Sequence, residues 1–232
     1  MEINLKCIIY WRIPKTGSTT IIDLISNNEN LKKKIKFIQL GHDECSFDIA
    51  EKQINRIINK YGLKKNEYIV LSSIRIPSKH ALSLYSHGSH GESMGFKEII
   101  NIYDIKNYED YLNKLFNNDI ILFNNNFGNY KYYYYKLENM KNIENLHIIR
   151  TENLVGELNY ILKKYVDKSI QLKDVNLNKY NMNHNLTKTK ENKKERQINS
   201  EQIKIISDKY FKEIDNLYEL FITDFINNNL LQ

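Results

Sequence analysis

The chain has 232 residues, a formal net charge of +6 and a pI near 9.0. Hydrophobic residues make up 41% and charged residues 27%, which is the balance of a globular protein and excludes a disordered or fibrous chain. No apolar run approaches the roughly 20 residues that a membrane helix needs, and no signal peptide is visible. We therefore expect a soluble, cytoplasmic protein with one domain over residues 1–232.

The positive charge is spread along the chain, with acidic residues between the basic ones. No nucleic-acid-binding motif accompanies it, so we predict neither a nucleic-acid partner nor a membrane partner. The excess charge suits an anionic cofactor and an anionic acceptor. Both cysteines, Cys7 and Cys45, are predicted to be reduced. Nothing in the sequence predicts an oligomeric state.

The first predicted strand, residues 5–13, leads through a short loop into a helix predicted at 18–27. The loop holds Lys15, Gly17 and several hydroxyl residues. A strand, a tight loop and a helix start in this order point backbone N–H groups at an anion, and Lys15 adds a cation. The loop therefore reads as a phosphate cradle. It is not a Walker loop, because there the lysine follows the glycines, whereas Lys15 precedes Gly17.

A second anion-binding pattern follows the strand predicted at 68–74. Arg75 comes directly after this apolar run, and Pro77 favours the start of a helix predicted at 78–87. Ser83 lies about two turns into that helix. The planar fork of Arg75 and the hydroxyl of Ser83 could converge on one anion.

The remaining predicted elements complete an α/β pattern. Further strands are predicted at 35–40 and 145–150. Strands separated by helices predict a P-loop-like three-layer α/β fold, with a central parallel sheet flanked by helices. Ligands of such folds bind at the carboxyl ends of the strands, where Lys15, His42 and Arg75 all lie. The other helices are predicted at 46–61, 107–117, 128–138, 153–165 and 200–227.

Two motifs resemble those of the PAPS-dependent sulfotransferases. Residues 14–20 are similar to the family's 5′-phosphosulfate loop, and residues 12–16 are closest to the uronyl 2-O-sulfotransferases of heparan and dermatan sulfate. Residues 75–85 are similar to the family's 3′-phosphate site. The resemblance implies transfer of a sulfuryl group from PAPS to a carbohydrate hydroxyl, with PAP as product and no metal. It implies these cofactor-binding residues: Arg12, Lys15, Thr16, Gly17, Ser18, Thr19, Thr20, Arg75 and Ser83.

The resemblance also implies the catalytic residues. A Gly-His pair often follows the second strand of glycan sulfotransferases, and Gly41-His42 follows the strand predicted at 35–40. His42 is therefore the expected general base, and Lys15 is expected to neutralise charge on the leaving phosphate. Other acid–base side chains near the predicted cleft remain rivals for the base. They are Asp43, Glu44, His87 and His90.

The polar, basic segment 183–196 resembles the loop that covers the nucleotide in this family, with Lys188 and Lys190 as cofactor-binding candidates and 200–227 as the closing helix. A solvated linker is the alternative for this segment. Two other functions remain open for the whole chain. One is a P-loop kinase-like nucleotide transferase, and the other is a basic glycan-binding module without catalysis.

Overall fold

The computed structural model describes a large part of the chain. The chain divides into two compact units. Unit 1 comprises Met1–Arg75 and Glu138–Val175, and unit 2 comprises Ile76–Leu137 and Asn176–Gln232. The expectation of a single domain over 1–232 stays a prediction. The described residues are 4–13, 16–40, 47–89, 103–117, 140, 142–172 and 200–230, without the side chains of 47–48, 86–89, 200 and 226–230.

Unit 1 is built on a four-stranded, all-parallel sheet in the order β2-β1-β3-β4. The two inner strands, β1 and β3, are buried along their whole length. A strand covered on both faces needs apolar side chains on both, so these strands appear in the sequence as unbroken apolar runs. The strands are β1 Cys7–Trp11, β2 Lys36–Gln39, β3 Tyr68–Ile74 and β4 Leu146–Arg150.

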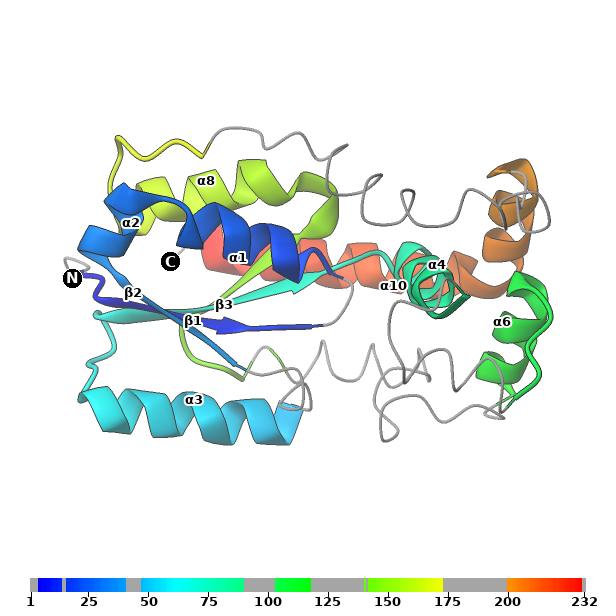
Figure 1. Ribbon diagram of the computed structural model, residues 1–232, viewed down its shortest axis with the longest axis horizontal. Coiled ribbons are helices and arrows are strands. Elements are labelled where there is room, and N and C mark those ends of the chain that lie inside the picture. Colours follow the sequence, from blue (N-terminus) through cyan, green and yellow to red (C-terminus); the bar gives the residue numbers. More distant parts are fainter. Residues whose placement is uncertain are drawn as a thin grey trace. The chain divides into compact units, whose positions relative to one another are not determined.

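Helices cover both faces of this sheet. Figure 1 shows α1, α2 and α8 on one face and α3 on the other, which confirms the predicted three-layer α/β fold. Each of the three crossovers between parallel strands carries at least one helix, as a parallel connection requires. The helices are α1 Ser18–Ser26, α2 Glu29–Lys34, α3 Phe47–Tyr61 and α8 Leu154–Tyr165, and the short 3-10 helix η2 Thr151–Asn153 precedes α8.

The main core of unit 1 lies between the sheet and the layer of α1, α2 and α8. Tyr10 and Leu71 from the inner strands pack there with Ile21 of α1 and Leu158 of α8, and all four side chains are fully buried. His147 of β4 places its ring 4.7 Å from that of Tyr165. Burial, assisted by the charge of Lys164, lowers the pKa of His147 to about 4. The imidazole is therefore neutral at physiological pH.

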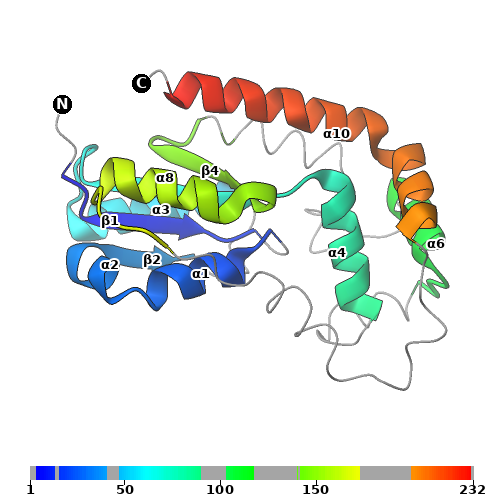
Figure 2. The same cartoon turned by 90° about the horizontal axis from the view of Figure 1, so that it is seen from above.

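Unit 2 consists, in its described part, of three helices. They are α4 Pro77–Ser89, α6 Tyr108–Phe116 and α10 Ser200–Leu230, and α4 packs against both of the others (Figure 2). The rings of Tyr85, Tyr108 and Tyr111 pack against one another, with centroids 5.3–6.3 Å apart. A carboxylate oxygen of Asp215 accepts the Ser78 N–H at 3.1 Å, so α10 supplies a cap for the start of α4.

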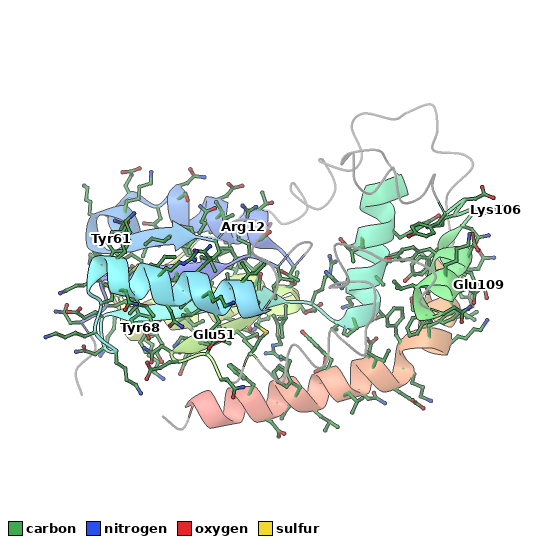
Figure 3. The ribbon with its side chains drawn as sticks, turned by 90° about the horizontal axis from the view of Figure 1, so that it is seen from below. Arg12, Glu51, Tyr61, Tyr68, Lys106 and Glu109 are labelled. Carbon is green, nitrogen blue, oxygen red and sulfur yellow. The ribbon has the colours of Figure 1, made fainter. Side chains whose placement is uncertain are left out.

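An ion pair adds to the link between α6 and α10. Lys209 Nζ lies 3.0 Å from Oε1 of Glu109, which Figure 3 labels on α6. Both side chains are well exposed, so the pair contributes little to stability.

The predicted elements agree with the structure to within a few residues wherever it describes them. The exception is α2, which the sequence analysis missed. This helix has six residues and one buried apolar side chain, Leu31, so it shows no helical period. Its signal is the cap instead, because Asn28 accepts the Leu31 N–H at 3.1 Å. The helix predicted at 128–138 lies outside the described residues.

Candidate functional site

The start of α1 is the centre of the candidate site. It follows β1, one of the two inner strands, and its N-cap residue Gly17 has left-handed backbone angles, φ 80° and ψ 16°. No side chain of the described residues caps this helix. The first N–H groups of an α-helix have no partner within the helix, so this helix start offers donors to an anion.

Gly17 is required there for two separate reasons. Its φ lies in the region that residues with a Cβ seldom occupy. A Cβ at this position would also lie only 2.7 Å from Cδ1 of Leu154, which is itself buried at the start of α8. Gly17 therefore lies close to the start of α8, and glycine is the residue that permits this approach.

A chain of buried hydroxyl groups fixes the loop to the sheet. Thr16 Oγ1 donates to the Ile13 carbonyl at 2.7 Å, so it must accept its other bond from Ser73 Oγ at 2.8 Å. Ser73 then accepts from the Tyr10 hydroxyl at 2.8 Å. Burial raises the pKa of Tyr10 and keeps this phenol protonated as the first donor. The Thr16 side chain therefore serves the loop itself, and only its backbone remains for a ligand.

Thr151 makes a second connection at the same edge of the sheet. It follows β4, and its hydroxyl lies 2.9 Å from the Thr16 carbonyl and 2.8 Å from the Ile74 carbonyl. Both distances are within hydrogen-bonding range, so one side chain touches the loop after β1 and the last residue of β3.

Three arginines lie at the carboxyl ends of neighbouring strands. Arg12 follows β1, Arg75 follows β3 and Arg150 ends β4. Figure 3 shows Arg12 at the carboxyl end of the strands, away from Tyr61, where α3 ends near the amino end of the strands. Arg150 is held within the protein, because its backbone N–H and its Nε donate to the Glu157 carboxylate at 2.7 and 2.5 Å. Arg12 and Arg75 are half-buried.

The other predicted site residues fall into three groups. In α1, Ser18 and Thr20 are buried, and Thr19 is exposed. Arg75 belongs to unit 1 and the half-buried Ser83 to unit 2, so their joint binding of one anion stays a prediction. The remaining candidates lie outside the described residues. They are Lys15, His42, Lys188 and Lys190.

The sequence analysis missed the residues that hold the loop. Ser73 and Thr151 read as ordinary hydroxyl residues, and Tyr10 reads as one more apolar position of β1. The usable signal was Ser72-Ser73 inside an otherwise apolar strand. Two buried hydroxyls need hydrogen-bond partners, and Ser72 finds one in the Trp11 carbonyl at 3.1 Å.

Among the described residues, no group of three or more His, Cys, Asp or Glu side chains could hold a metal ion. No helix in the described ranges combines the length and the apolar character that crossing a membrane requires. Comparisons with family models, with curated proteins and with solved structures returned no match for this chain.

Proposed function

We propose that this chain is a PAPS-dependent O-sulfotransferase that acts on a hydroxyl of a carbohydrate, and that it works in the cytoplasm. One observation carries the proposal: the left-handed Gly17 starts α1 at the carboxyl end of an inner strand, in the sequence order that resembles the sulfotransferase loop. Arg75 supports it, because it follows the neighbouring strand of the same sheet. The buried, unbonded thiol of Cys7 suits the reducing compartment.

The donor set fits a nucleotide with phosphate at both ends of its ribose. The N–H groups at the start of α1, together with Lys15, would bind the 5′-phosphosulfate. Arg75 would bind the 3′-phosphate through its planar guanidinium group. ATP carries no 3′-phosphate, so it would make no such contact with Arg75. A role of Arg75 in 3′-phosphate binding therefore favours PAPS over the ATP of a kinase-like transferase.

The chemistry would need little beyond positioning and charge. His42 would take the proton of the acceptor hydroxyl, whose oxygen then forms the new bond to sulfur. The bond between sulfur and the phosphate oxygen breaks, and PAP leaves with the negative charge that Lys15 neutralises. Fixed donors placed where charge develops are worth several kcal/mol in such transfers. Because Lys15 and backbone N–H groups supply that charge stabilisation, the proposal requires no metal.

The nucleotide class can be tested by thermal unfolding of the purified chain with PAP, ATP, GTP or NAD at equal concentrations. A ligand that binds only the folded state raises the unfolding temperature according to its affinity. PAP should raise it more than the other three. A larger effect of ATP or GTP would favour the kinase-like alternative.

Turnover separates an enzyme from a glycan-binding module. With PAPS and a panel of carbohydrate acceptors, Lys15→Ala should lower kcat about 100- to 1000-fold. His42→Ala should lower it by about 100- to 10000-fold without changing the affinity for PAP, since the base contacts the acceptor. PAP binding without any transfer in the wild type would leave the module as the function.

A further inference from the structure

The hydroxyl of Thr151 joins the two predicted phosphate-binding segments, in addition to the Thr16–Ser73 hydrogen bond. It contacts the Thr16 carbonyl, one residue before the N-cap of α1, and the Ile74 carbonyl, one residue before Arg75. A hydroxyl has one proton, so the two carbonyl oxygens share it in a three-centre hydrogen bond. All three residues belong to unit 1.

The packing around Thr151 makes this link short and direct. Its Cγ2 methyl group would lie 3.5 Å from a Cβ at Gly17, so the side chain lies beside the N-cap residue. The segment after Thr16 offers the N–H groups of α1, and the segment after Ile74 offers the Arg75 guanidinium. The pairing of β1 with β3 and the Thr16–Ser73 hydrogen bond also connect these segments, and the Thr151 hydroxyl adds a link directly next to both anion-binding groups.

We infer that Thr151 is a positioning residue that sets the spacing of the two phosphate sites and so selects nucleotides with phosphate at both the 5′ and the 3′ position. This inference rests on the proposed function. A ligand that binds two sites at once gains the full benefit of both only if their spacing is set before binding. A ligand with one phosphate gains nothing from that spacing. Removal of the Thr151 hydroxyl should thus lower the affinity for the nucleotide with two phosphates and leave the affinity for each nucleotide with one phosphate unchanged.

The test compares the calorimetric affinity of the full chain for PAP, adenosine 5′-phosphate and adenosine 3′-phosphate. The quantity of interest is the ratio of Kd for adenosine 5′-phosphate to Kd for PAP, which measures the gain from the second phosphate. Thr151→Val keeps the shape of the side chain and removes the proton. It should lower this ratio about 5-fold, which corresponds to the roughly 1 kcal/mol of one hydrogen bond, while Kd for each monophosphate changes less than about 2-fold. Thr151→Ser retains a hydroxyl group and should give the same ratio as the wild type.

Two further variants serve as a control and as a substitute. Thr223→Val removes a threonine hydroxyl that bonds the Glu219 carbonyl on α10, and it should leave the ratio unchanged. If Thr151→Val does not fold, Thr151→Cys takes its place, because the thiol is a weak donor of similar size and should give an intermediate ratio. Equal ratios in the wild type and in the folded Thr151 variant would overturn the inference and leave the proposed function standing. A wild-type ratio near one would overturn both.

Discussion

Replacing Gly17 by alanine should destabilise unit 1 far more than an ordinary glycine substitution does. The new side chain must adopt φ near +80°, which costs about 1–2 kcal/mol for a residue with a Cβ. Its Cβ also meets Leu154 Cδ1 at 2.7 Å. Leu154 is 3% exposed and packed in the core, so it cannot move without disturbing its neighbours. Overpacking of this kind costs about 1–3 kcal/mol. We therefore expect a loss of about 2–5 kcal/mol in the free energy of unfolding.

Gly62 supplies a matched control for the backbone part of this effect. It follows α3 with φ +58°, and a Cβ there would meet nothing within 4 Å. Gly62→Ala should therefore cost only the backbone strain of about 1–2 kcal/mol. The difference between the two variants measures how closely the loop approaches α8.

The assay is urea-induced unfolding followed by the fluorescence of Trp11. This is the only tryptophan of the chain, and it is buried in β1, so its emission reports on unit 1. A double-mutant cycle with Leu154→Ala isolates the contact, because Gly17→Ala should cost only the backbone strain once Cδ1 is gone. The reasoning is refuted if Gly17→Ala costs no more than Gly62→Ala, or if the cycle shows no coupling.

Three other variants probe the sheet, the helical unit and the nucleotide site. The free energy of unfolding should fall as the pH drops from about 6.5 towards 4, because His147 is protonated in the unfolded chain and still neutral in the folded one. His147→Gln should reduce this loss by on the order of 2 kcal/mol, measured by unfolding followed through Trp11 fluorescence. Asp215→Ala should cost about 1–2 kcal/mol by circular dichroism, because it removes the cap of α4, whereas the exposed Asp224→Ala should cost less than about 0.5 kcal/mol. Arg75→Ala should raise the calorimetric Kd for PAP about 10- to 100-fold and leave the Kd for adenosine 5′-phosphate unchanged. Replacement of the exposed Arg56 by alanine is the control and should change neither Kd.

Each of these expectations can fail in a specific way. An unchanged pH profile in His147→Gln would mean that the imidazole is not held neutral by burial. Equal losses of unfolding free energy in Asp215→Ala and Asp224→Ala would mean that Asp215 does not cap α4. A parallel loss of PAP and of adenosine 5′-phosphate in Arg75→Ala would place this arginine away from the 3′-phosphate.

The strands and the longer helices were predictable because their signals are local. β3 is an unbroken apolar run that ends at Arg75, and α8 carries a regular apolar face. The helix start at Ser18 was predictable from the turn residues, including Gly17, that follow an apolar run and precede a helical pattern. These features depend on residues within a few positions of one another, which is what a sequence displays.

The contacts that hold the candidate site were not predictable because their partners are distant in sequence. Thr16 and Ser73 are 57 residues apart, and Thr151 is 135 residues from the carbonyl it bonds. The apolar run of β3 indicates that Ser73 is buried, but it does not indicate which residue bonds its hydroxyl. Thr16 shows the consequence: the resemblance implies that it binds the cofactor, and in the structure its hydroxyl is bonded to Ile13 and Ser73.

The decisive experiment for the proposed nucleotide site is a crystal structure of the chain with PAP. We expect the 5′-phosphate within hydrogen-bonding distance of the N–H groups of Gly17, Ser18 and Thr19, and the 3′-phosphate against the guanidinium of Arg75. A nucleotide bound at another edge of the sheet, or with its 3′-phosphate away from Arg75, would contradict this expectation.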